Sequence, residues 1–444
     1  MQIPNGTATV SEEAAAQGES RSLGTIPEKA VRRPGIREVR ITAKDGLCAV
    51  ALQVWSAAAF GAENRLRRYC YRRCFLFPSC RHWRVPLAHA RIALLRIKLR
   101  GFFRGEFAHS PPLFYGLEAL QIDDIAMALL IGFIIDCLVG DPHWLPHPVV
   151  LIGRLIAWLE RVLRRLLPKT AAGERTAGGL IWLVTAAVSG LVPWGILRVC
   201  GLISPWLTLG VQSIMCWQVI APRALRDESM KVYRALKTGT LQDARRAVSM
   251  IVGRDTEQLD AAAVTRAAVE TVAENASDGV IAPMLFLALG GAPLGFLYKA
   301  VNTMDSMLGY VEPPYKNVGC IPARMDDLFN FLPARLCAML MLAAGGLLGM
   351  DVKNGWKIFR RDRYNHASPN SAQTESVCAG LLGLRLAGDA SYHGVLHHKK
   401  FIGDPLREIT PQDIPQSCRL MYATTVLMLL LCTLTRCVLW AILP

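Results

Sequence analysis

The densest group of side chains that could perform chemistry lies in residues 269–283, which read VETVAENASDGVIAP. Glu270 and Glu274 are four residues apart, so on a helix they would share one face, and Asn275 and Asp278 would continue it. An apolar run follows directly. Carboxylates at a membrane boundary are costly unless they are paired, bound to a metal or open to water, which makes these side chains candidate functional groups. The spacing alone also fits an ordinary solvated helix end.

A second segment places three oxygen ligands close together. Asp326, Asp327 and Asn330 stand at positions i, i+1 and i+4. Mg²⁺ is usually held by one or two carboxylates together with water and substrate phosphates, and carboxylate and amide oxygens are suitable ligands. The spacing therefore makes this segment the candidate magnesium site. A solvated turn is the alternative that the sequence leaves open.

Three further polar groups also stand at the edges of apolar runs. They are Lys299 with Asn302 and Asp305 at helical spacing, a Gly-Asp-Pro turn followed by His147, and a Ser-Pro-Asn turn with Asn370 followed by Glu375. Taken singly, each group is more often structural than functional. Because five such groups recur at the ends of apolar runs, they could converge on one site at a membrane surface.

The elements that must position these groups are apolar enough for a bilayer. The chain has 444 residues, of which 52% are hydrophobic, and its mean hydropathy is +0.28. Candidate spans are residues 179–198, 204–221, 280–300, 333–350 and 422–443, with a shorter run at 127–140. We expect an all-α, polytopic integral membrane protein with about four to six transmembrane or re-entrant helices. Two polar stretches, 223–279 and 351–420, should form amphipathic or loop regions in the cytoplasm.

The order of these runs raises a question of topology. Loops 141–178, 223–279 and 351–420 are rich in Lys and Arg and should be cytoplasmic. If residues 280–300 and 333–350 both span, the loop 301–332 lies outside, away from ATP. The first run contains Gly290-Gly291-Ala292-Pro293 and the second is short, so both could instead be re-entrant segments that return to the cytoplasmic face.

Residues 1–126 differ in character from the rest of the chain. They are basic, contain Cys and many Arg, and lack a periodic apolar face, whereas Met127 opens the patterned region. We predict that this extension lies outside the fold, that Met127 is the biological start, and that residues 127–444 form the membrane-embedded domain. The net charge of +15 would allow nucleic-acid binding, but the basic stretch shows no pattern for it and no nucleic-acid partner is expected.

Read together, the motifs resemble the adenosylcobinamide-phosphate synthase family, also called the cobinamide synthases or CobD/CbiB proteins. The resemblance runs from about Leu129 to Asp413. It rests on GDPHWLPHPVVLIGR at 140–154, TVAENASDGVIAP at 271–283, KAVNTMDSMLGY at 299–310, ARMDDLFNFLPAR at 323–335 and SPN at 368–370. The chain departs from the family where SPNSAQTE replaces the frequent SPNAGWPE, although Glu375 is kept, and where Met325 replaces a commoner Leu.

The resemblance implies a membrane ligase of vitamin B12 biosynthesis. Such an enzyme joins (R)-1-aminopropan-2-ol or its O-phosphate to the free propionate carboxylate of adenosylcobyric acid, and ATP with Mg²⁺ activates the acid. It would act in the bacterial inner membrane with its site facing the cytoplasm, and other membrane proteins of the late pathway are candidate partners. The expected catalytic residues are Glu270, Glu274, Asp278 and Asp305. The expected substrate and nucleotide contacts are His147, Asn275, Lys299, Asn302, Arg324, Asn370 and Glu375, and the expected metal ligands are Asp326, Asp327 and Asn330.

Two other functions remain open from the sequence. Carboxylates at a membrane edge also serve ion pathways, so the chain could be a transporter or a corrinoid-binding scaffold. A membrane alcohol phosphotransferase is disfavoured, because Asp278-Gly279 lacks the earlier aspartate and the later Ala-Arg of that signature. No Gly-x-x-x-x-Gly-Lys-Ser/Thr loop occurs, so a nucleotide pocket would be of another kind.

Overall fold

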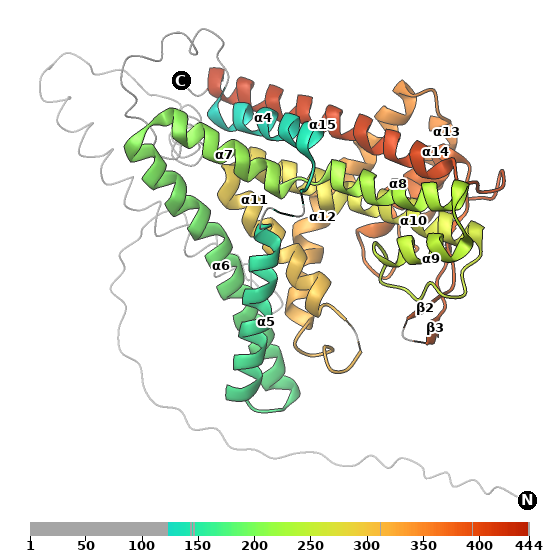
Figure 1. The fold of residues 1–444 in the computed structure, drawn as a ribbon, viewed down its shortest axis with the longest axis horizontal. Helices are drawn as coiled ribbons and strands as arrows, with labels where there is room; N and C mark the ends of the chain where they lie inside the picture. Colours follow the sequence, from blue (N-terminus) through green and yellow to red (C-terminus); the bar gives the residue numbers. More distant parts are fainter. Residues whose placement is uncertain (1–122, 143, 145–146, 311, 393, 443–444) are drawn as a thin grey trace, which may run out of the picture. The chain divides into compact units, whose positions relative to one another are not determined.

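Helices make up most of the described chain, as Figure 1 shows. The computed structural model describes residues 123–142, 144, 147–310, 312–392 and 394–442, all within one compact unit. The helices are α4 (Asp124–Val139), α5 (Pro148–Leu166), α6 (Ala171–Ile203), α7 (Pro205–Val219), α8 (Pro222–Thr238), α9 (Leu241–Ser249), α10 (Ala261–Asn275), the π-helical turn η2 (Ala276–Ile281), α11 (Ala282–Leu308), α12 (Cys320–Leu347), α13 (Val352–Asp362), α14 (Ser371–Leu382) and α15 (Asp413–Ile442). Two small antiparallel sheets pair β1 (Leu386–Ala387) with β4 (Phe401–Ile402), and β2 (Ala390–Tyr392) with β3 (Val395–His397).

Four helical runs among the described residues are long and apolar enough to cross a membrane. They are Ala171–Ile203, Ala261–Leu308, Cys320–Leu347 and Asp413–Leu439. Helices α6 and α15 also expose large apolar side chains, among them Leu191, Val199 and Leu434. Contiguous apolar surface of this kind suits contact with lipid rather than water. The predicted all-α, polytopic membrane architecture is therefore confirmed.

The run from Ala261 to Leu308 folds back on itself at Gly290–Gly291. Gly291 has φ +65°, which a residue with a side chain rarely adopts, and both glycines leave the helical conformation. The aromatic rings of Phe286 and Tyr298 stack across the turn with centroids 5.0 Å apart. In a straight helix, residues 278 and 298 would be separated by about 30 Å. Instead, Tyr298 Oη lies 3.0 Å from the backbone oxygen of Asp278, so the two halves of residues 280–300 fold back against each other, as a re-entrant segment would require.

The segment that follows differs from the prediction. Residues 301–332 are not a loop: residues 301–308 end α11, and α12 already begins at Cys320. The run 333–350 is therefore the second half of one longer helix rather than a short segment of its own. Helix α12 is continuous through Pro333 and carries Asp326, Asp327 and Asn330 in its first half. The predicted spans at 127–140 and 204–221 correspond to the short helices α4 and α7, which pack against each other.

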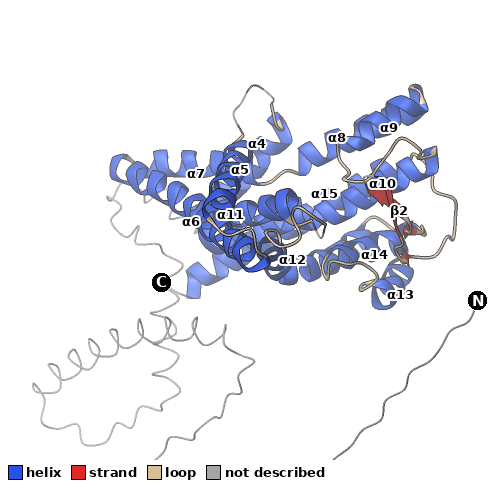
Figure 2. Cartoon of the chain, turned by 90° about the horizontal axis from the view of Figure 1, so that it is seen from below, coloured by secondary structure: helices blue, strands red, loops and turns tan. Residues whose placement is uncertain are grey.

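The two polar stretches form the part of the fold that borders the candidate site. Thr240 and Asp243 build a capping box at the start of α9, and Asp260 caps α10 by accepting a hydrogen bond from the Ala263 N–H at 2.7 Å. The second stretch contains α13, α14 and the small strands, which the sequence analysis did not predict. Figure 2 shows the strands close to α10 and α14, and β1 contacts α10 while β4 contacts α14. Helix α14 is buried along its whole length.

The first described residue ties the two ends of this unit together. Asp123 caps α4 by accepting from the Ile125 N–H at 2.8 Å. Its carboxylate also forms an ion pair with Arg436 of α15, whose Nε lies 3.1 Å from Oδ1. Arg436 is only 4% exposed, so this pair lies inside the protein. Helix α4 starts before Met127, and the boundary predicted between residues 126 and 127 therefore falls inside a helix.

We predict that a chain beginning at Asp123 is as stable as the full chain, whereas one beginning at Met127 is less stable. The shorter chain lacks the carboxylate that faces buried Arg436, and breaking a buried ion pair costs about 3–5 kcal/mol. Thermal unfolding of the detergent-purified proteins measures the difference. Asp123→Asn in the full chain separates the lost charge from the lost length and should reproduce most of the decrease. Equal unfolding temperatures for all four proteins would show that the pair contributes nothing.

Candidate functional site

Three sequence motifs meet where the two arms of the fold-back pack against α12. Tyr298 Oη lies 3.0 Å from the Asp278 backbone oxygen and 2.7 Å from Oδ1 of Asn330, so its single proton serves two acceptors. Nδ2 of Asn330 donates to Asp326 at 2.9 Å, and Nδ2 of Asn302 lies 3.4 Å from the other oxygen of that carboxylate. The fold-back therefore brings together side chains that stand in different motifs of the sequence.

Asp278 lies in the π-helical turn η2. Such turns are rare and occur often at functional sites. The wider turn also changes the direction of the side chains that follow. The helix face that Glu270 and Glu274 share through their four-residue spacing therefore does not continue to Asp278. Glu270 and Glu274 both line a cavity described below, whereas Asp278 does not line it and lies within electrostatic range of Asp326 and Lys299. The prediction that these acids share one face holds for the first two only.

Five carboxylates form a group around this contact, which we call the acid group: Glu274, Asp278, Asp305, Asp326 and Asp327. Their charges lie within range of one another, and none forms an ion pair with a Lys, Arg or His among the residues that the structure describes. Uncompensated negative charge of this kind suits a divalent cation. No three His, Cys, Asp or Glu side chains in the described ranges are close enough to hold a metal alone. The residues therefore fit Mg²⁺ only as one or two protein ligands completed by water and phosphate oxygens, which is a usual arrangement for this ion.

Asn330 already has partners at both ends of its amide, and it is completely buried. Its observed contacts orient Asp326, and its predicted role as a metal ligand stays a prediction. Asp327 accepts a hydrogen bond from Ser368 Oγ at 3.1 Å, while its backbone oxygen accepts from Nδ2 of Asn370 at 2.9 Å. Arg335 donates to Asn370 Oδ1 at 3.0 Å. The Ser-Pro-Asn turn is thus held against α12, next to the acid group.

A polar cavity of about 220 Å³ lies beside the acid group, between α10, the loop before it, the start of α14 and the β2–β3 hairpin. Four predicted residues line it: Glu270, Glu274, Asn275 and Glu375. Ser371 Oγ donates to Glu274 at 2.8 Å and so fixes that carboxylate at the cavity wall. Because Glu274 lines the cavity and also lies within range of Asp278, it belongs to both the cavity and the acid group.

Charges of both signs face this cavity. Arg254 forms an ion pair with Glu270, which also accepts from the Ala387 N–H at 2.6 Å. Lys399 Nζ donates to Tyr392 Oη at 2.6 Å. Glu375 is only 4% exposed and forms no hydrogen bond or ion pair with any described residue. Burial, with repulsion from the two glutamates of α10, raises the pKa of Glu375 well above its ordinary value of 4.5.

The residues of the cavity wall that were not among the predicted site residues include Arg254, His366, Tyr392 and Lys399. His366 precedes the Ser-Pro-Asn turn, and burial lowers its pKa, which favours the neutral imidazole. Lys399 belongs to the basic run HHKK at 397–400. That run was the only signal for it, since nothing in the spacing links it to Arg254 or to α10.

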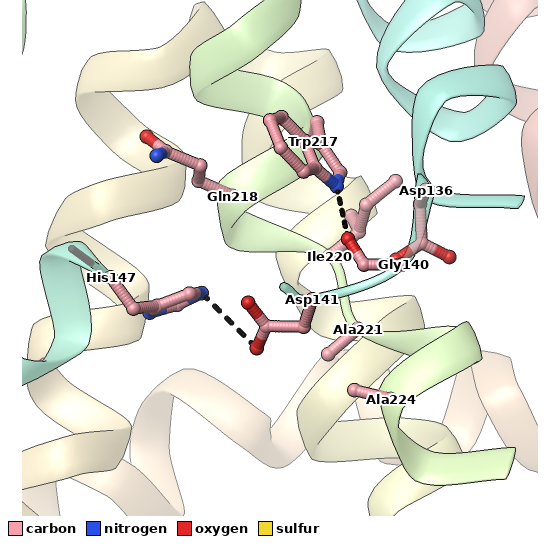
Figure 3. Close-up of a pocket in the computed structure, with 9 residues that line it drawn as sticks. All are labelled: Asp136, Gly140, Asp141, His147, Trp217, Gln218, Ile220, Ala221 and Ala224. Atoms are coloured by element: carbon pink, nitrogen blue, oxygen red, sulfur yellow. Dashed lines mark hydrogen bonds and ion pairs between the residues drawn. The ribbon is translucent and has the colours of Figure 1, made fainter. Parts of the chain in front are cut away.

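His147 lies at a different place, shown in Figure 3. Its Nδ1 accepts from the Val149 N–H at 3.2 Å and caps α5, and its Nε2 lies 3.8 Å from Asp141. Trp217 Nε1 donates to the Gly140 oxygen at 2.9 Å on the other side of a hollow of about 10 Å³. Such a hollow holds about one water molecule, so it is too small for a substrate. Lys299 is near enough to affect both His147 and Asp141, and so links this turn to the acid group.

Arg324, like His147, does not line the cavity and does not belong to the acid group. It is exposed at the first turns of α12 and forms no hydrogen bond or ion pair with a described residue. The other predicted residues lie in the acid group, along the cavity wall, in the Ser-Pro-Asn turn, or beside the acid group on α11 and α12.

The raised pKa of Glu375 predicts how a Glu375→Gln variant should respond to pH. The folded protein binds this proton more tightly than the unfolded chain does, so the stability it contributes is full below about pH 4.5 and is lost as the pH rises through the folded pKa. The Gln side chain of the variant does not titrate, so the variant does not lose stability in this way. The unfolding temperature of the variant relative to the parent should therefore increase as the pH rises above about 4.5, by roughly 2–4 °C for each unit of pKa shift. A difference that does not change with pH would mean that Glu375 keeps an ordinary pKa.

The model of the CobD/Cbib protein family matches residues 129–421. The cobalamin biosynthesis protein CbiB of Salmonella typhimurium is 45% identical over 315 residues, covering 70% of this chain and 97% of the relative. The cobalamin biosynthesis protein CobD of Pelobacter propionicus is 48% identical over 313 residues, covering 70% and 94%. No solved structure matches the chain. The chain therefore belongs to the CobD/Cbib family of cobalamin biosynthesis proteins.

Proposed function

We propose that the protein is an ATP-dependent ligase that joins (R)-1-aminopropan-2-ol, or its O-phosphate, to the free propionate carboxylate of adenosylcobyric acid. Family membership supports the role in cobalamin biosynthesis. The observation that supports the ligase reaction itself is that the acid group and the polar cavity lie side by side. The acid group suits a metal-bound triphosphate, the cavity suits a small polar substrate, and Glu274 belongs to both.

The reaction needs both regions because a carboxylate and an ammonium group do not form an amide in water. In the first step a carboxylate oxygen attacks the γ-phosphorus of ATP, giving an acyl phosphate and ADP. In the second step the neutral amine attacks the acyl carbon, the C–N bond forms, and the C–O bond breaks as inorganic phosphate leaves with the electron pair. The amine must release protons, and Glu274 is placed to accept one. Catalysis then depends on positioning the two reactants and on excluding water.

Mg²⁺ would neutralise phosphate charge in the first step. Asp326 is the best-placed ligand, because Asn330 and Asn302 orient its two oxygens, and Asp305 and Asp278 lie within range of it. Lys299 lies on the same arm of the fold-back as Asn302 and close to Asp278. This position suits a contact with a transferred phosphate, because a lysine acts on phosphate as a point charge.

ATP is present in the cytoplasm, so this proposal requires both regions to face that side of the inner membrane. The fold-back at Gly290–Gly291 supports such an arrangement, because its two arms return towards each other. Asp278 on the first arm and Asp305 on the second could then both lie at the cytoplasmic surface.

We predict that Asp326→Ala lowers the rate of cobinamide formation by about 10- to 100-fold, as is typical when a metal site is disturbed. Asp327→Ala should have a smaller effect, because that carboxylate also accepts from Ser368. Detergent-purified protein with adenosylcobyric acid, ATP, Mg²⁺ and each amine donor provides the assay. Raised Mg²⁺ should partly restore Asp326→Asn.

Glu257→Ala is the matched control, because Glu257 is an exposed carboxylate outside the acid group. Its kinetics should equal those of the parent. If both aspartate variants also behave like the parent, the pair does not belong to the site. If the parent forms no amide with either donor but moves corrinoid across the membrane of proteoliposomes, the protein is a transporter and the ligase proposal is wrong.

Labelling of Cys320 tests which side of the membrane the candidate site faces, because Cys320 is the first residue of α12 and is partly exposed. In a variant with the other cysteines replaced, a membrane-impermeant thiol reagent should label Cys320 in inverted vesicles and leave it unlabelled in intact spheroplasts. The reason is that the start of α12 adjoins the acid group. Labelling from the periplasmic face would place that region away from ATP and contradict the proposed orientation.

A further inference from the structure

Two charged groups of the 220 Å³ cavity lack a partner of opposite charge, and they differ in sign. Glu375 is buried, lines the cavity, and has no hydrogen bond or ion pair with a described residue. Lys399 also lines the cavity, donates only to Tyr392 Oη, and forms no ion pair within the described ranges. The two groups do not pair with each other, although each lies within electrostatic range of the other. Arg254, by contrast, is already neutralised by Glu270.

This arrangement leaves the cavity complementary to a small molecule with a positive end and a polar or negative end. Burying an unpaired carboxyl is costly, and a bound ammonium group would remove that cost. The volume is below the roughly 300–1,000 Å³ of sites that enclose drug-sized ligands. A nucleoside triphosphate or a corrin ring is therefore too large to be enclosed here, whereas a three-carbon amino alcohol or its phosphate fits.

We propose that this cavity is the binding site of the amine donor, with Glu375 receiving the ammonium group and Lys399 the hydroxyl or phosphate end. The assignment rests on the proposed ligase function. It separates the two halves of the reaction in space. The propionate carboxylate of the substrate is activated at the acid group, and the amine binds in the cavity. Glu274 stands between them, held by Ser371, and is the group to which the amine proton passes before the nitrogen attacks the acyl carbon.

The first measurement is the dependence of the initial rate on the concentration of each substrate, in the full chain. Glu375→Gln should raise the KM for either amine donor by about 30-fold or more, as expected when one partner of a buried charge contact is removed. The KM values for ATP and adenosylcobyric acid should stay within about twofold, because those substrates bind elsewhere. Lys399→Met should raise the KM for aminopropanol O-phosphate and hardly change that for aminopropanol if Lys399 binds a phosphate.

Matched controls are Glu257→Gln and Lys400→Met, which change the same types of charge at exposed positions next to the cavity segments but outside the cavity wall. Both should leave all KM values unchanged. Unfolding temperatures show whether each variant is folded. Ser371→Ala keeps the cavity but frees Glu274, so it should lower kcat more than it changes the KM for the amine.

A second measurement separates the site from the reaction. Calorimetric titration of aminopropanol and of its O-phosphate into the purified protein, without ATP or corrinoid, should show binding that Glu375→Gln weakens. Binding without amide formation by the parent would reject the ligase and keep the site. Amide formation with an unchanged amine KM in folded Glu375→Gln, or a raised KM for ATP instead, would keep the ligase and reject this cavity as the amine site.

Discussion

The backbone turn at Gly290–Gly291 is the constraint on which the rest of the candidate site depends. Its positive φ at Gly291 lets one helical run return along itself, so that Tyr298 reaches the backbone of Asp278. Without the turn, Lys299, Asn302 and Asp305 would be tens of ångströms from the acids of α10, at about 1.5 Å per residue. The turn also explains how the acidic residues before the apolar run 280–300 and those after it can lie close together. Both apolar arms stay together, and their polar ends stay on one side.

The second constraint is the change of helical pitch at η2. Glu270 and Glu274 precede it and face the cavity, whereas Asp278 lies within it and approaches Asp326. A regular helix would have kept all three on one face. The π turn therefore divides a single acidic motif between two neighbouring regions, and Glu274 is the last carboxylate before the division.

The sequence predicted the apolar helices, the interruption at Gly290–Gly291 and all five residues of the acid group, because hydropathy and residue spacing are local properties. It did not predict that Asp326 lies in a helix rather than a loop, since the apolar run begins only at residue 333, whereas α12 begins at Cys320. It also missed Arg254, Tyr392 and Lys399, which reach the cavity from loops and a hairpin. Contacts between loops far apart in the chain depend on tertiary packing, and periodic patterns in the sequence do not predict them.

The departure from the family pattern at SPNSAQTE shows how the buried helix α14 keeps Glu375 in place. Gln373 is completely buried where the family often has Trp, and its Nε2 donates to the backbone oxygens of Arg363 and Pro369 at 3.1 and 3.0 Å. These bonds hold the turn before α14, which the second proline of SPNAGWPE would stiffen in the family sequence. Ser371, at a position where the family often has Ala, contributes the hydroxyl that holds Glu274. Glu375 thus lies at the cavity, buried and without a hydrogen bond or ion pair to a described residue. A protein gains no stability from such a group by itself, whereas a bound cationic ligand would remove the cost of burying it.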